Sequence, residues 1–169
     1  MIYKEADGCL RVLDPIYENE ETVPGANVYL INAIPLSNPD LIKTDAPELI
    51  LDKTLFGIEP AHGWCYYYTK AELARQQTDW EQVVKLYNQA QKDGFSVSIP
   101  IENLPFIEGF AMTGDSEMAI KLTERTLKTQ KELCPAIYTL WDRVLQTSSR
   151  QTLNALEINE RIRQSGCKP

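Results

Sequence analysis

The sequence contains one histidine, no Cys-x-x-Cys pair and no long run of apolar residues. A helix that crosses a bilayer needs about 20 apolar residues, so no membrane span is predicted within this chain. One histidine and four scattered cysteines do not provide the ligand spacing of a zinc site, and we expect no metal. The glycines are isolated, so there is no glycine-rich phosphate loop and no cofactor is expected.

Basic residues are fewer than acidic ones. The chain has 17 Lys and Arg against 24 Asp and Glu, which gives a net charge of −7. The basic residues do not cluster, and an acidic surface repels phosphate backbones, so we expect no nucleic-acid partner. A length of 169 residues with 43% hydrophobic residues is typical of one globular domain with a core.

Two amphipathic helices are predicted between Trp64 and Gly94. In the first helix, apolar residues fall at i, i+3, i+4, i+7 and i+10 from Trp64, and the second helix repeats this spacing from Trp80. Asp79 is a suitable N-cap for the second helix, with Gln82 as the other half of a capping box. Two such helices cannot bury both apolar faces alone, so a stack of helical hairpins is predicted.

Two further hairpins follow. Helices are predicted over 103–113 and 116–131, joined at Gly114-Asp115, and the second turn follows the first by 115 − 79 = 36 residues. A stripe from Ile137 to Leu145 begins the third pair, and a polar helix over 150–164 ends it, as a terminal capping helix should. The sequence therefore predicts an all-α fold of about three stacked antiparallel hairpins.

The first 59 residues are predicted to form a mostly irregular extension that packs on the helices of residues 60–164, with a tail over 165–169. A strand is expected at Cys9–Leu13, where it pairs either with Ile2–Lys4 as a short β-hairpin or with a partner upstream of this sequence. A short helix is expected over 26–34, and an irregular or short helical piece over 48–56. Trp80 is expected to be buried between hairpins.

The hairpins resemble the tetratricopeptide repeat, whose period is about 34 residues. The resemblance covers about 60–164 and implies a right-handed solenoid. The third hairpin matches only in its helix spacing, and Thr123 and Thr126 depart from the pattern. The matching positions are Ala71, Ala74, Val83, Tyr87, Ala90, Ile107, Phe110, Gly114, Asp115 and Ala119.

In such a stack, the first helix of each hairpin lines a concave groove. A groove of mixed apolar and charged residues suits an extended or helical peptide, so a peptide segment or protein partner is expected there. The alternative is that the chain's own N-terminal extension occupies the groove. By the repeat's pattern, the candidate groove residues are Tyr68, Glu72, Arg75, Gln76, Leu104, Glu108 and Met112.

Two segments, Gly8–Asp14 and Trp64–Arg75, resemble the soluble C-terminal tail of large bacterial multi-pass membrane proteins of the glycosyltransferase type. This resemblance implies a non-catalytic protein-interaction or structural module, tethered by helices upstream of Met1. It further implies an extracytoplasmic location, the alternative being the cytoplasm. Cys9 and Cys65 lie in these two segments, and a disulfide between them would suit that compartment. The alternative is that the cysteines are buried or idle thiols.

A function of another class remains open. The aromatic residues Trp64 and Tyr66–Tyr68, with nearby carboxylates, would suit a carbohydrate-acting enzyme or a sugar-binding domain. Their helical spacing favours packing over a carbohydrate platform. His62 has no adjacent nucleophile motif and is expected to serve helix entry, so we expect no catalytic residue and no enzyme activity.

Overall fold

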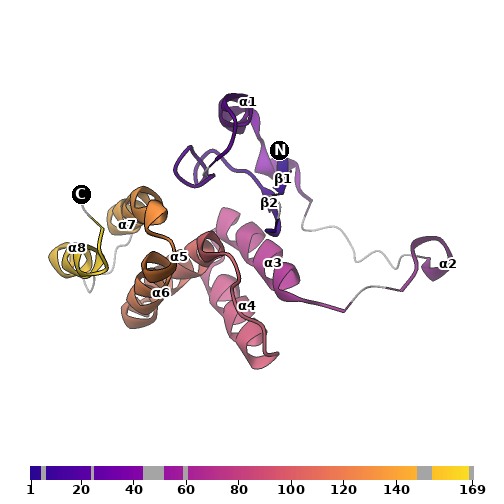
Figure 1. Cartoon of the computed structure of the whole chain (residues 1–169). Coiled ribbons are helices and arrows are strands. Elements are labelled where there is room, and N and C mark those ends of the chain that lie inside the picture. Colours follow the sequence, from indigo (N-terminus) through magenta and orange to yellow (C-terminus); the bar gives the residue numbers. More distant parts are fainter. Residues whose placement is uncertain (5–6, 24, 44–51, 59–60, 148–153, 168–169) are drawn as a thin grey trace.

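The computed structural model describes residues 1–4, 7–23, 25–43, 52–58, 61–147 and 154–167. The described part is mostly helical, with one two-stranded sheet (Figure 1). In chain order, its elements are β1 (Ile2–Lys4), β2 (Leu10–Val12), α1 (Val28–Ala33), η1 (Ile34–Leu36), η2 (Pro39–Leu41), α2 (Lys53–Phe56), α3 (Trp64–Gln76), α4 (Trp80–Lys92), η3 (Pro100–Asn103), α5 (Leu104–Thr113), α6 (Ser116–Thr129), η4 (Lys131–Leu133), α7 (Cys134–Thr147) and α8 (Ala155–Gln164), where η is a short 3-10 helix.

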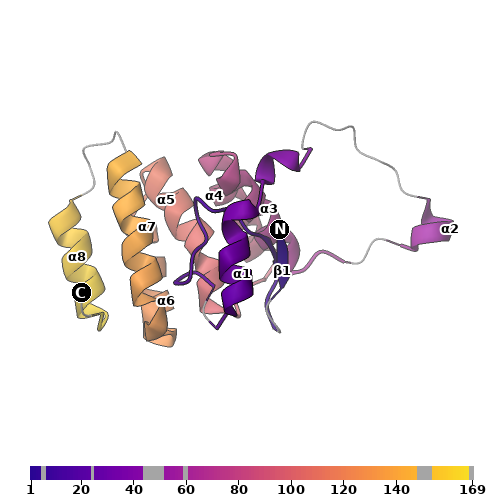
Figure 2. The same cartoon turned by 90° about the horizontal axis from the view of Figure 1, so that it is seen from above.

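The helices from α3 onward stack side by side, as Figures 1 and 2 show. α3 packs on α4, α4 on α5, α5 on α6 and α7, and α6 on α8. This order confirms the all-α class and the packed neighbouring helices. The predicted helix over 150–164 is observed from Ala155, and its first residues, 150–153, lie outside the described part of the chain.

In the turns from α3 to α4 and from α5 to α6, the second helix begins with an aspartate N-cap, as was predicted for Asp79. The carboxylate of Asp79 accepts a hydrogen bond from the backbone N–H of Gln82 at 3.0 Å, and Asp115 caps α6 in the same way. The residue before each cap has positive φ, at 58° for Thr78 and 94° for Gly114. These two positions are 114 − 78 = 36 residues apart, so the two hairpins turn with the same local geometry.

The main hydrophobic core lies between the hairpins. Trp141 and Phe106 are among its largest fully buried side chains. α4 and α5 approach closely at Gly109, where an added Cβ would lie 2.5 Å from a methyl carbon of Val83. The prediction that Trp80 is buried is wrong. It is only partly buried because it is the first residue of α4, at an end of the helix pair, where fewer neighbours surround it.

The N-terminal extension contains the expected β-hairpin. β1 and β2 pair antiparallel, with Tyr3 opposite Arg11, so the partner of the predicted strand lies within this sequence. Behind the hairpin, Leu13, Val23 and Ile34 form a second, small core, against which α1 packs. α2 instead lies well apart from α1 and from the helical stack (Figures 1 and 2).

A disulfide that the sequence did not predict joins Cys134 to Cys167, with Cα atoms 5.6 Å apart. It ties the start of α7 to the residues just after α8. The predicted tail over 165–169 therefore contains a buried, bonded residue, since Cys167 is 3% exposed.

Candidate functional site

The candidate site is the surface formed by α3, α5 and α7. The N-terminal segment, defined here as residues 9–22, crosses this surface from the start of α3 to α7. Cys9 lies at one end, bonded to Cys65 on α3, and Glu21 lies near the other, where its carboxylate accepts a hydrogen bond from Thr139 Oγ1 on α7 at 2.7 Å. Several contacts of the segment join residues far apart in the sequence, and these fix its path over the helices.

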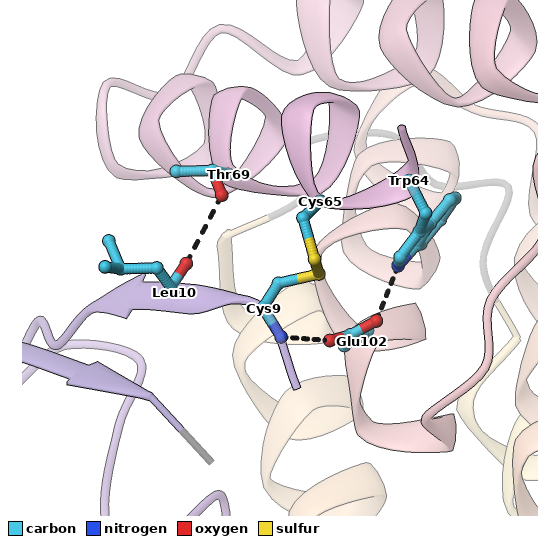
Figure 3. The surroundings of a disulfide bond; sticks show 6 residues. All are labelled: Cys9, Leu10, Trp64, Cys65, Thr69 and Glu102. Carbon is cyan, nitrogen blue, oxygen red and sulfur yellow. Dashed lines mark hydrogen bonds between the residues drawn. A yellow bond between two sulfur atoms is a disulfide. The ribbon is translucent and has the colours of Figure 1, made fainter. Parts of the chain in front are cut away.

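The first anchor is the disulfide between Cys9 and Cys65, whose Cα atoms are 5.1 Å apart (Figure 3). Beside it, the buried carboxylate of Glu102 accepts hydrogen bonds from the backbone N–H of Cys9, at 2.8 Å, and from the indole N–H of Trp64. One carboxylate therefore connects the N-terminal segment, α3 and η3.

The free edge of β2 faces α3. Leu10 and Val12 are two residues apart, so their carbonyls point the same way, away from β1. The hydroxyl of Thr69 donates to the Leu10 carbonyl at 3.3 Å, and the amide of Gln76 donates to the Val12 carbonyl at 2.7 Å. The donors lie seven residues apart on α3, which places them on one helix face two turns apart. α3 therefore holds the edge of β2 through backbone atoms.

Beyond the strand, four charged side chains form a chain of ion pairs across the three helices. Arg75 on α3 lies 2.9 Å from Glu72 and 3.0 Å from Glu108 on α5. Glu108 is also held by the guanidinium of Arg143 on α7, with N–O distances of 2.7 and 2.9 Å. Glu72, Arg75 and Glu108 are each 2–3% exposed. Paired charges can remain ionised at such burial, whereas unpaired charges cannot.

The N-terminal segment adds its own charges and an aromatic ring to this chain. Arg11 pairs with Glu18 at 3.1 Å, and both are buried. The ring of Tyr17 lies 4.1 Å from the guanidinium carbon of Arg75 and 4.9 Å from that of Arg143. Its hydroxyl donates to the Arg75 carbonyl at 3.0 Å. The cluster thus holds three arginines and three glutamates, so its formal charge balances.

The electrostatics of the cluster follow from burial and from these pairings. Burial raises the pKa of Tyr17 to about 12, and nearby Glu108 adds to the shift. Burial also raises the pKa of Glu18, with a further contribution from Glu72. For Arg75, burial lowers the pKa, but the facing Glu72 and Glu108 outweigh it, and the net direction is up. The two carboxylates therefore favour the charged form of Arg75.

The structure brings most of the predicted groove residues together but does not leave them accessible. Glu72, Arg75 and Glu108 are in direct contact, and Gln76 holds the N-terminal segment. Tyr68, Glu72, Arg75, Leu104 and Glu108 are all buried, and Leu104 belongs to the hydrophobic core. Met112 is partly buried, and its sulfur lies 3.8 Å from the hydroxyl of Thr147. The N-terminal segment lies on this surface, where Tyr17 contacts both Arg75 and Arg143.

Sequence reasoning missed the residues that complete the cluster. Arg143 had a detectable signal, because it lies 35 residues after Glu108, which in turn lies 108 − 72 = 36 residues after Glu72. These separations are close to the predicted repeat period. Arg11 and Tyr17 had no such signal, because the N-terminal segment lies outside the repeats.

The aromatic residues at the start of α3 pack mainly on one another and on the core. Tyr67 and Tyr68 are buried. Trp64 lies 5.5 Å from the ring of Phe106, and Tyr66 stacks on His62 at 3.6 Å between ring centroids. This packing gives the aromatic residues at the start of α3 a structural role in the described fold.

The arrangement as a whole is suited to holding a segment in place. No group of three or more metal-binding side chains occurs among the described residues, and no described helix is long and apolar enough to cross a membrane. No match to the chain was found among family models, curated proteins or solved structures.

Proposed function

We propose that this chain is a non-catalytic structural module of stacked, tetratricopeptide-like hairpins. The observation that carries the proposal is the occupation of the α3–α5–α7 surface by the N-terminal segment. A binding surface that is charge-balanced, buried and covalently closed by Cys9–Cys65 serves to fix one end of the chain against the stack.

The two disulfides support an oxidising compartment, since such bonds persist outside the reducing cytosol. This agrees with the resemblance of the disulfide-bearing segments to the extracytoplasmic tail of membrane-bound glycosyltransferase-type proteins. In such a protein, the module would follow the membrane helices as a rigid tail. Its stack would hold the segment of chain that leaves those helices. On these grounds we propose that the module belongs to a larger chain and lies on the extracytoplasmic side of a bacterial membrane.

Expression with and without export to the periplasm tests this proposal. The exported protein should carry both disulfides, seen by mass spectrometry of non-reduced peptides, and should show higher resistance to urea than the protein kept in the cytosol. Equal stability of the two preparations, with free thiols at all four cysteines, would reject the extracytoplasmic assignment. The coding sequence upstream of Met1 tests whether this chain is the tail of a membrane protein. A series of apolar segments is expected there, and a polar upstream sequence would contradict the proposal.

A further inference from the structure

Large apolar side chains are exposed almost only in the N-terminal extension. Among the described residues, eleven such side chains are exposed, and ten of them precede residue 59, since only Leu156 lies in the helical stack. The hairpins, with two-thirds of the sequence, bury their apolar residues well. Exposed apolar groups concentrated in this way mark an interaction surface.

Seven of these ten exposed residues fall into two groups, and the other three, Ile2, Leu10 and Ile16, lie outside them. The first, which we call the ridge, consists of Val28, Tyr29, Leu36 and Leu41 on α1, η1 and η2, which are 62–83% exposed. Leu30 and Ile31, also on α1, pack against the small core and so hold the ridge on the molecule.

The second group, which we call the arm, is the segment 52–58 with α2. All seven of its residues are exposed, and its three large apolar side chains, Leu55, Phe56 and Ile58, are 68–86% exposed. In both views α2 lies well away from the ridge and from the stack (Figures 1 and 2). The arm of one copy therefore does not cover its own ridge.

Charge also distinguishes these two groups from the rest of the molecule. Residues 26–42 contain one charged side chain, Asp40, and in the arm Asp52 and Lys53 cancel. Each copy carries a net charge of −7, so two copies repel where their charged surfaces meet. The ridge and the arm are surfaces at which two copies can meet without opposing like charges.

We propose that two copies of this chain form a dimer by exchanging arms, each seating Leu55, Phe56 and Ile58 on the ridge of the other. Each copy would contribute seven large apolar side chains, at roughly 100–150 Å² each, or about 800 Å² per partner. That area is what a stable dimer of standard size buries. The exchange is reciprocal, so a two-fold axis closes it and no further copies add. The proposal does not depend on the function proposed above.

Sedimentation velocity of the oxidised chain over a hundredfold concentration range tests the proposal. The wild-type chain should sediment as a dimer at the upper end of the range. Phe56→Asp in the arm and Leu36→Asp in the ridge should each weaken dimerisation by roughly tenfold or more. Leu156→Asp is the matched control, since it adds the same charge at an exposed leucine of α8 and should leave the dimer unchanged.

Mixing the two defective variants makes the test specific to arm exchange. Phe56→Asp retains a functional ridge and Leu36→Asp retains a functional arm, so an equimolar mixture keeps one intact arm–ridge contact. The mixture should associate more strongly than either variant does alone. All side chains changed are exposed, and circular dichroism with a count of free thiols verifies that each variant folds.

Three results would overturn the proposal. The first is a wild-type monomer throughout the range, including one that instead binds phosphatidylcholine vesicles through Phe56, which would assign the surface to lipid. The second is a dimer that neither substitution weakens. The third is a mixture that associates no more strongly than either variant alone, which would argue against a contact between arm and ridge.

Discussion

Replacement of Arg75 by methionine should lower the free energy of unfolding by about 3–5 kcal/mol, the usual cost of removing one partner from a buried ion pair. Arg75 is 2% exposed and is the partner of both Glu72 and Glu108. Methionine keeps much of the aliphatic length, so the loss is chiefly electrostatic. Glu108 keeps its contacts with Arg143, whereas Glu72 loses its ion-pair partner, which places the expected cost near the lower end of the range.

Urea denaturation of the oxidised protein at neutral pH, followed by circular dichroism, measures this loss. The matched control is Arg163→Met, because Arg163 pairs with Glu160 at 3.0 Å but both side chains are about half exposed. An exposed pair contributes about 0–1 kcal/mol, so the control should change little. Arg75→Met with as small an effect as Arg163→Met would refute the buried cluster as described.

A second variant separates lost charge balance from lost packing. Adding Glu72→Gln to Arg75→Met removes the uncompensated carboxylate and should recover part of the stability. A deficit that this second substitution does not reduce would assign the loss to packing.

Three further changes have defined outcomes. Tyr17→Phe should lower the free energy of unfolding by about 1 kcal/mol at pH 9 through a lost hydrogen bond. Because the pKa of Tyr17 in the folded protein is raised to about 12, the wild type alone loses about 2 kcal/mol of stability between pH 10 and 12, and urea unfolding should find the variant more stable than the wild type at the higher pH. An unchanged order of stability would contradict the burial of this hydroxyl. Gly109→Ala should destabilise by about 1–3 kcal/mol through overpacking against α4, and a variant as stable as wild type would show that the helices can move apart. The double substitution Cys9→Ser, Cys65→Ser should cost up to about 4 kcal/mol in urea, given the 56 residues between the cysteines, and no loss would mean that the bond does not constrain the chain.

The helical stack was predictable because its signals are local. Apolar spacing of 3.6 residues located α3, α4 and α7, and capping residues such as Asp79 and Asp115 located the turns. The same period predicted that Glu72 and Glu108 would share a face. Local spacing does not report how many neighbours surround a residue at a helix end, and for this reason the prediction for Trp80 was wrong.

The path of the N-terminal segment was not predictable, because its contacts are distant in sequence and have no period. Tyr17 meets Arg75 across 58 residues, and Cys9 meets Glu102 across 93. Four cysteines allow three pairings, so sequence alone did not reveal that Cys134 and Cys167 are joined. Charge balance in the cluster depends on Arg11 and Glu18 as well, and nothing in their immediate sequence indicates burial.

The central claim is that the N-terminal segment lies on the surface of α3, α5 and α7. Nuclear Overhauser contacts between the ring protons of Tyr17 and the side-chain protons of Arg75 and Arg143 test it most directly. The guanidinium carbons lie 4.1 and 4.9 Å from the ring centroid, so contacts to both arginines are expected, with the Arg75 protons shifted by the ring current. The absence of both contacts in the oxidised protein, with an unshifted Arg75 side chain, would contradict the account.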